Sequence, residues 1–244
     1  MNAVIARITI RQLLSRRRTV LLLLLGGVVV LVALALRLGV DEIYLDMYTA
    51  VVLSNLGLAT LLPLVALLFG TGALGGELED GTAIYLLAKP IGRWTVLLTK
   101  LAVAAACAVL LTCAPMLLAG LIGAGGLGDG LVVGFVVAGA IGSVIYCAIF
   151  VALSLVTSRA LVFGLGYVLI WEGLLAGLFP GTRTFSVRQV ASAIADALAD
   201  VPADVFAAEL DLATAVIVGA AILVGATVLA ARRLSDLEIA GESA

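Results

Sequence analysis

The sequence offers few side chains that could carry out covalent or metal chemistry. It contains no histidine, which excludes Ser-His and Cys-His nucleophilic sites, histidine-ligated zinc or haem, and a histidine proton relay. Cys107, Cys113 and Cys147 all lie inside apolar runs without C-x-x-C spacing, so neither a disulfide framework nor a cysteine-based metal site is expected. We interpret the cysteines as small packing residues.

Glu172 is an acidic residue that falls well inside an apolar run, next to Trp171. A carboxylate in hydrocarbon is costly, so such a residue marks a functional site or a buried pair by default. Three interpretations stay open: structural pairing, a wet external vestibule where the chain turns back, or a place on a substrate path. An intramembrane hydrolase is disfavoured, because it needs a paired nucleophile and base.

The elements that must position these residues are apolar helices. The chain has 244 residues, of which 64% are hydrophobic and 12% are charged, whereas an average soluble domain is roughly half apolar and about a quarter charged. Because a spanning helix needs about 20 apolar residues, the length admits about six to eight spans. The composition therefore predicts an all-α, polytopic membrane protein.

Six apolar segments are predicted to span the membrane: about 19–39, 48–74, 94–120, 131–156, 160–179 and 211–231. Pro63 and Pro115 suggest kinks in the second and third spans. Gly134, Ala138 and Gly142 have the spacing that lets helices approach closely. The first apolar run exceeds the usual signal-peptide core of about 7–15 residues, so it is interpreted as a retained helix.

The charged residues divide between the two sides of this six-span arrangement. The basic residues of one side are Arg7, Arg11, Arg16, Arg17, Arg18, Lys89, Arg93, Lys100, Arg159, Arg232 and Arg233. The other side carries Asp41, Glu42, Asp46, Asp129, Asp196, Asp200, Asp204 and Glu209 against Arg183 and Arg188. Because basic loops stay inside, we expect both termini in the cytoplasm and the chain in the cell inner (cytoplasmic) membrane.

The segment before the first span is predicted to be a surface helix. On a helix of residues 3–18, Arg7, Arg11 and Arg18 share one face, and apolar residues occupy the rest, which is typical of a basic amphipathic helix on the inner membrane surface. The alternative is a charged flank that only sets topology. The predicted organisation is thus a surface helix at 1–18, a six-span domain at 19–231 and a cytoplasmic tail at 232–244.

The connection between the second and third spans is predicted to contain a short amphipathic helix. Gly75 and Gly76 are expected to end the second span, and a helix then begins with the acids Glu77, Glu79 and Asp80, which favour the N-terminal end of the helix dipole. Ile84, Leu87 and Ala88 form an apolar stripe, and Lys89 and Pro90 end the helix. Its acidic end is available to a cytoplasmic partner; the alternative is a solvated loop.

The segment after the fifth span is predicted to contain an external helix. Ser186 and Gln189 form a capping-box pattern, and Pro202 ends the segment. An apolar stripe at helical spacing follows the cap: Val187, Val190, Ala191, Ile194 and Leu198. We expect this helix to cap the bundle or to lie on the outer leaflet.

Residues 77–100 resemble a recurring signature of the permease subunits of ATP-binding-cassette transporters, of the type-2, ABCG-like exporter class. The residues that carry the resemblance are Glu77, Glu79, Gly81, Thr82, Leu86, Leu87, Pro90, Gly92, Arg93 and Lys100. The sequence departs from the signature at Leu78, where a basic residue is common, and at Thr99, where glycine is common. The six-span layout and the basic N-terminal helix also match.

The resemblance implies a transport subunit without its own ATPase site. It makes residues 77–89 a coupling helix that docks on a separate ATPase, and it implies two ATPase copies and a second permease, the same or a related chain. ATP and Mg would be bound by the ATPase, with no cofactor in this chain and no nucleic acid. Independently, the sequence has no G-x-x-x-x-G-K-[ST] motif.

An ion-gradient-driven secondary transporter or channel subunit is the alternative function. Such a protein needs intramembrane charges or broken helices in matching halves. Glu172 is the candidate charge, and no internal repeat is evident in the sequence.

Overall fold

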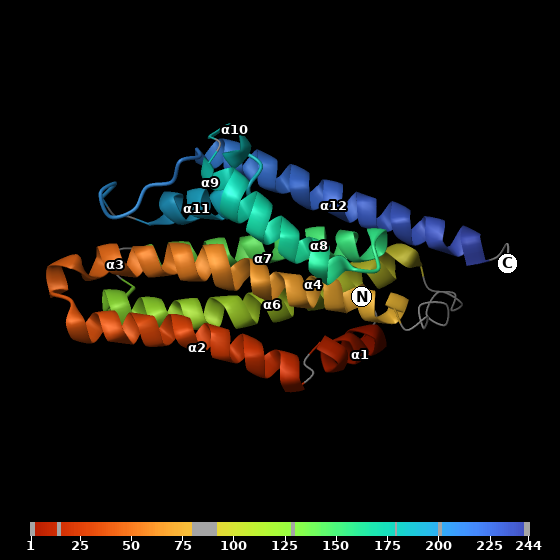
Figure 1. Cartoon of the computed structure of the whole chain (residues 1–244), viewed down its shortest axis with the longest axis horizontal. Coiled ribbons are helices and arrows are strands. Elements are labelled where there is room, and N and C mark those ends of the chain that lie inside the picture. The colour runs from red at the N-terminus through yellow and green to blue at the C-terminus, as the bar shows by residue number, and fades with distance from the viewer. Residues whose placement is uncertain are drawn as a thin grey trace.

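The computed structural model describes residues 3–13, 16–79, 92–127, 130–178, 180–199 and 202–241, and the ordered elements in these ranges are all helices. In chain order they are α1 (Ala3–Leu13), α2 (Arg16–Gly39), η1 (Glu42–Tyr44), α3 (Leu45–Val52), η2 (Leu53–Leu61), α4 (Leu62–Glu79), α6 (Arg93–Ala124), α7 (Leu131–Val156), α8 (Ala160–Gly166), η3 (Tyr167–Leu175), α9 (Ala176–Leu178), α10 (Pro180–Arg183), α11 (Val187–Leu198) and α12 (Leu212–Gly241). Figure 1 shows them as a long bundle with most axes close to parallel.

Six of the described helical segments are long and apolar enough to cross a bilayer, which confirms the predicted number. They are Thr19–Gly39, Glu42–Gly75, Trp94–Ala124, Leu131–Val156, Ala160–Leu178 and Leu212–Ser235. The second segment combines η1, α3, η2 and α4, and the fifth combines α8, η3 and α9.

The expected break at Gly75 and Gly76 is wrong, because α4 continues through both glycines to Glu79. A helical glycine costs only about 1 kcal/mol relative to alanine, and a helix in an apolar bundle must satisfy its own backbone groups. Glu77 and Glu79 therefore lie in the last turn of α4 instead of the first turn of a new helix.

The second and fifth spans each contain a stretch of π-helix, η2 and η3, nine residues long. In η2 the Thr60 hydroxyl donates to the carbonyl of Asn55, five residues earlier, at 2.9 Å. π-Helical turns are rare and occur frequently at functional sites. Such turns change the face on which the following residues lie.

The helix α7 forms the centre of the bundle. It packs against α4, α6, α11 and α12, and α2 packs on the far side of α6. The largest fully buried side chains of α7 are Phe135, Tyr146 and Phe150. The helix α12 is the least buried of the spans, so its apolar residues face the surroundings of the bundle.

The helix α11 packs along α7 and α12 within the bundle, whereas the sequence led us to expect a helix that caps the bundle or lies on the outer leaflet. Its residues Val187, Val190, Ala191 and Ile194 are buried, whereas Leu198 is exposed. It lies along α7, where a Cβ atom added to Gly134 would stand 2.6 Å from the carbonyl oxygen of Ala195. Because glycine has no side chain, Gly134 of α7 leaves the space that α11 fills.

The depth of α11 follows from its register on α7. A Cβ added to Gly142 would contact the Ala191 Cβ at 3.5 Å, and Gly142 lies eleven residues after the first residue of α7. At 1.5 Å per residue this is about 16 Å along the helix, roughly half of a bilayer core of about 30 Å. The N-terminal end of α11 is therefore its deeper end.

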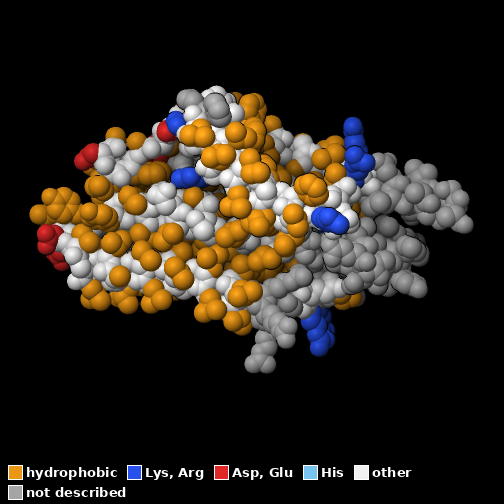
Figure 2. Space-filling model, viewed as in Figure 1, with side chains coloured by type: hydrophobic (Ala, Val, Ile, Leu, Met, Phe, Trp, Pro, Cys, Tyr) orange, Lys and Arg blue, Asp and Glu red, His pale blue; other side chains and the backbone are white. Residues whose placement is uncertain are grey.

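Charged side chains gather at the two ends of the visible face. Figure 2 shows acidic groups in the half that carries α3 and most of the basic groups toward the opposite end, with some basic atoms also in the acidic half. The last helix, α12, continues to Gly241. The predicted tail therefore begins as a helical extension of the sixth span.

Candidate functional site

The predicted coupling segment lies mostly outside the described residues. This applies to Asp80, Gly81, Thr82, Leu86, Leu87 and Pro90. The structure describes its two ends: the backbone of Glu77 and Glu79 in the last turn of α4, and Arg93 as the first residue of α6 after the N-cap Gly92. The docking role of these residues stays a prediction.

Lys100 joins the two helices that flank this connection. Its side chain is only 1% exposed, and its Nζ donates a hydrogen bond of 3.0 Å to the carbonyl oxygen of Ala73. Ala73 lies near the end of α4, and Lys100 lies in the second turn of α6. An ammonium group favours the carbonyl end of a helix, so Lys100 ties the departure and return points of the connection together.

The N-terminal segment forms two helices and not the continuous one expected over residues 3–18. The helix α1 ends at Leu13, and Arg18 belongs to α2. Arg7 and Arg11 are exposed, while Thr9 and Leu13 are buried where α1 packs on α6 and α4. One face of α1 therefore packs against the bundle, and the face with Arg7 and Arg11 is exposed, as a membrane-surface helix requires.

Glu172 is buried at the N-terminus of α11, where three donors meet its carboxylate. Its side chain is 4% exposed. One oxygen accepts from the Val187 backbone N–H at 2.9 Å and from the Tyr167 hydroxyl at 3.2 Å, and the other accepts from the Ser186 hydroxyl. A carboxylate is favoured at this end of a helix, and its hydrogen bonds replace those lost from water.

The predicted cap of α11 is present and extends this network. Ser186 is the N-cap, and its Oγ accepts from the Gln189 backbone N–H at 3.2 Å while donating to Glu172. Glu172 lies in η3 of the fifth span. A single carboxylate thus fixes α11 to the fifth span, and these contacts are those of a structural cap.

Aromatic rings form one wall of the Glu172 site. Tyr146 stacks on Phe150 with ring centroids 5.8 Å apart and an interplanar angle of 8°, and Phe150 meets Tyr167 edge-on at 6.2 Å. Such contacts add to the stabilisation from apolar burial. They join α7 to the fifth span beside the carboxylate.

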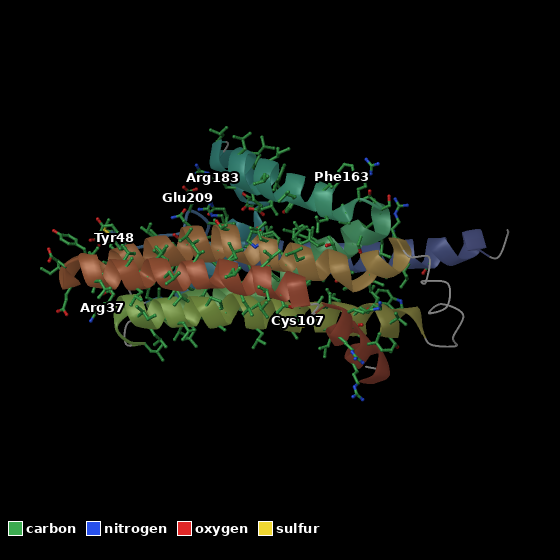
Figure 3. The ribbon with its side chains drawn as sticks, turned by 60° about the horizontal axis from the view of Figure 1, so that its bottom comes forward. Arg37, Tyr48, Cys107, Phe163, Arg183 and Glu209 are labelled. Carbon is green, nitrogen blue, oxygen red and sulfur yellow. The ribbon has the colours of Figure 1, made fainter. Side chains whose placement is uncertain are left out.

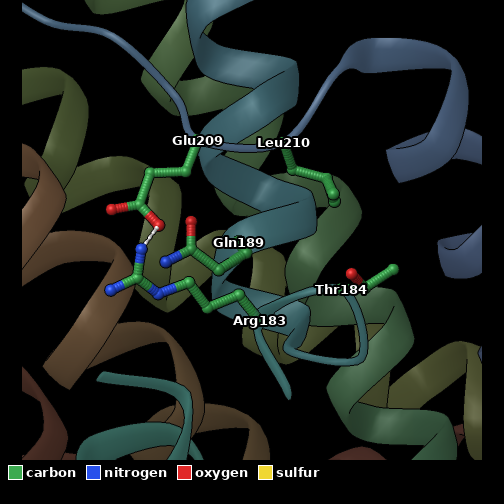
Figure 4. Close-up of a pocket in the computed structure, with 5 residues that line it drawn as sticks. All are labelled: Arg183, Thr184, Gln189, Glu209 and Leu210. Carbon is green, nitrogen blue, oxygen red and sulfur yellow. Dashed lines mark hydrogen bonds and ion pairs between the residues drawn. The ribbon is translucent and has the colours of Figure 1, made fainter. Parts of the chain in front are cut away.

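A pocket of about 500 Å³ lies between α11 and the chain that leads into α12. It is lined by Arg183, Thr184, Gln189, Glu209 and Leu210. Figure 4 shows the guanidinium of Arg183 pointing at the Glu209 carboxylate, with which it forms an ion pair. Figure 3 shows the same two residues part-way along the bundle, farther from its end than Arg37.

Arg183 also closes the end of the fifth span. Its Nε donates to the carbonyl of Ala176 and its Nη2 to the carbonyl of Gly177, both at 3.2 Å. These carbonyls belong to α9, and the last carbonyls of a helix have no partner within that helix. One side chain therefore connects the fifth span to the segment before the sixth.

Arg188 and Asn55 form a second polar contact that the sequence did not reveal. The Arg188 Nη2 donates to the Asn55 Oδ1 at 3.3 Å, across 133 positions of sequence. Arg188 entered the sequence analysis only as a loop charge. The signal for it lay in Ser54, Asn55 and Thr60, which interrupt an otherwise apolar span.

Among the described residues, no group of three or more His, Cys, Asp or Glu side chains is arranged to hold a metal ion. Residues 3–198, from α1 through α11, match a family model described as ABC-2 family transporter protein. No curated protein matches the sequence.

Proposed function

The chain belongs to the ABC-2 transporter family, and on that premise we propose that it is the permease subunit of an ATP-driven exporter. The family's membrane component lacks an ATPase domain, and this sequence has no phosphate-binding loop motif. A separate ATPase subunit, present in two copies, must then supply the energy. A second permease, the same or a related chain, completes the working unit.

The family match carries this proposal, and the six candidate spans support it. In the proposed mechanism the ATPase docks on the connection between α4 and α6. Because Lys100 bonds the end of α4 to the start of α6, a push on the connection moves both helices together. Both pack on α7, so the displacement reaches the centre of the bundle.

The fifth span has the contacts needed to follow such a displacement. It joins α7 through the aromatic contacts of Phe150 and Tyr167, and it holds α11 through Glu172. Movement of this span would carry the N-terminus of α11 with it. The substrate path would then open toward the end of the bundle that carries the acidic groups.

The distribution of charge supports the orientation of the subunit. We infer that the end with α1, Arg159, Arg232 and Arg233 is cytoplasmic, because basic flanks are retained inside. The acidic end with Asp41 and Glu42 is then external. In this orientation the connection at 80–91 faces the cytoplasmic ATPase.

The docking role of the acidic end is tested with Glu77→Ala and Glu79→Ala. A partly desolvated charge pair at an interface costs about 2–5 kcal/mol when one partner is removed, so each variant should bind the ATPase at least about tenfold more weakly. The measurements are a pull-down of the ATPase and transport-coupled ATP hydrolysis. Glu42→Ala, at the opposite end of the bundle, is the matched control.

Two outcomes would contradict the docking role. If both alanine variants bind the ATPase and transport like the wild type, Glu77 and Glu79 take no part in docking. If the variants lose thermal stability in detergent, the acids are structural.

A further inference from the structure

The second span presents polar side chains on a face that is otherwise apolar. Asn55 is exposed, and Ser54 and Thr60 are partly exposed. One and two turns away from Asn55 on the same face, Val51 is 45% and Tyr48 is 40% exposed. Asn55 lies ten residues into the helix that begins at Leu45, about 15 Å along the span, at a depth where polar groups are costly.

The Asn55 side chain is held in one orientation. Its Nδ2 donates to the carbonyl of Val51 at 3.0 Å and to the Ser54 Oγ at 3.3 Å. The carbonyl oxygen of the amide is thereby turned to Arg188, which donates to it at 3.3 Å. Asn55 therefore positions the guanidinium without neutralising it.

Arg188 forms no ion pair with another described residue. The ion pairs among the described residues are formed by Arg37 with Glu42 and by Arg183 with Glu209, and neither includes Arg188. The oxygens of Glu172 are occupied by Tyr167, Ser186 and Val187. Arg188 is only partly buried, and its guanidinium has five N–H donors.

The surroundings of Arg188 on α11 are apolar, since its neighbours Val187 and Val190 are buried hydrophobic residues. A guanidinium binds carboxylate or phosphate through two parallel hydrogen bonds, and this preference is stronger where water is scarce. An arginine at this depth that forms no direct ion pair with another described residue is expected to mark a ligand path.

We propose that Arg188 and Asn55 form a binding site for the anionic head group of a transported amphiphile. Arg188 binds the carboxylate or phosphate, Asn55 positions Arg188, and the apolar part of the ligand lies along Val51 and Tyr48. This assignment rests on the proposed transport function, because it names the chemistry of the substrate that the permease moves.

The test is equilibrium binding to the purified full chain in phosphatidylcholine nanodiscs without ATP. The probes are a dansyl-labelled fatty acid and its methyl ester, which differ only in charge, and the signal is energy transfer from tryptophan. The wild type should bind the acid at least tenfold more tightly than the ester. Arg188→Gln should abolish this preference, while Arg232→Gln, at an exposed arginine of α12, should keep it.

A second variant neutralises the net positive charge of the site and keeps the arginine. Asn55→Asp places a carboxylate opposite the guanidinium, so it should also abolish the preference for the acid even if Arg188→Gln does not fold. Equal binding of acid and ester by the wild type would overturn the proposal. So would a preference that persists in folded Arg188→Gln and Asn55→Asp proteins, as judged by thermal unfolding.

A third arm separates a transported ligand from a resident lipid. Phosphatidylglycerol added to the nanodiscs should not displace the fatty acid from the wild type; displacement would assign the site to membrane lipid and overturn the substrate assignment. Because no ATP is present, failure of ATPase coupling leaves this result intact. Conversely, normal coupling with no charge preference would reject the anion site alone.

Discussion

Two buried charged residues, Glu172 and Lys100, show how this chain accommodates charge within an apolar bundle. Each is at most 4% exposed and is directed at groups of the backbone: Glu172 at the N–H of Val187, and Lys100 at the carbonyl of Ala73. In both cases the sign of the charge matches the helix end or carbonyl it meets. Burial is tolerated because each charge replaces its hydration with hydrogen bonds.

Glu172→Ala is predicted to destabilise the bundle by about 2–4 kcal/mol, because it leaves buried donors of Ser186, Val187 and Tyr167 without their acceptor. Glu172→Gln keeps one acceptor oxygen and should cost less. The measurement is thermal unfolding in neutral detergent. Glu42→Ala is the control, since the Glu42 side chain is 91% exposed; equal stability of Glu172→Ala and this control would contradict the capping role.

At the scale of elements, α11 depends on the absence of side chains on α7. Gly134→Ala is predicted to destabilise the protein by about 1–3 kcal/mol, because the new Cβ would stand 2.6 Å from a backbone oxygen that cannot rotate away. Gly225→Ala is the matched control, since nothing lies within 4 Å of its added Cβ. Similar unfolding temperatures for the two variants would show that α11 is not packed against Gly134.

The stability of the first turn of α12 is predicted to depend on pH. Asp211 precedes this helix, and the backbone N–H of Thr214 donates to its carboxylate at 2.9 Å, which lowers the pKa of Asp211 below its ordinary value of 3.8. The stabilisation is therefore present above pH 3.8 and is lost as the pH falls through the lower folded-state pKa.

Hydrogen exchange measures this effect directly. Protection of the first turn of α12, measured as the exchange rate relative to the intrinsic rate at the same pH, should fall at acidic pH in the wild type, and Asp211→Ala should show low protection at every pH. Asp211→Asn keeps a capping oxygen and should remove the pH dependence. Unchanged exchange in Asp211→Ala would rule out a capping role.

The elements that the sequence predicts well are those encoded locally. The six spans follow from apolar length, and the cap of α11 follows from Ser186 and Gln189, which lie three residues apart. The break at Gly75 and Gly76 was wrong because a packed apolar helix overrides a weak local preference. The stripe on α11 predicted a buried face but not its partner, which depends on Gly134 and Gly142 of another helix.

The candidate sites were less predictable because they join distant parts of the chain. Glu172 stood out in the sequence by its charge, but its partners Ser186 and Val187 come from the next helical layer. The contact between Arg188 and Asn55 spans 133 positions, and no local pattern specifies it. The π-helical stretches η2 and η3 also arise from tertiary packing and have no signature in periodicity.

At the scale of the whole molecule, acidic residues lie toward one end of the bundle and most basic residues toward the other. This distribution predicts which end faces the cytoplasm. On a background without the three native cysteines, Ala203→Cys is expected to react with a membrane-impermeant maleimide from outside. Ser158→Cys, at the basic end, should react only after the membrane is opened; both positions are exposed. The reverse pattern would invert the proposed orientation and place the connection at 80–91 outside.

The peripheral position of α12 has a consequence for the synthesis and membrane insertion of the protein. Ribosomes add about 5–20 residues per second, so the five earlier spans and α11 leave the ribosome seconds before α12 is complete. During that interval the sides of α7 and α11 that later contact α12 have no partner from this chain. We therefore expect lipid or an insertion factor to cover this seam until the sixth span packs against α7 and α11.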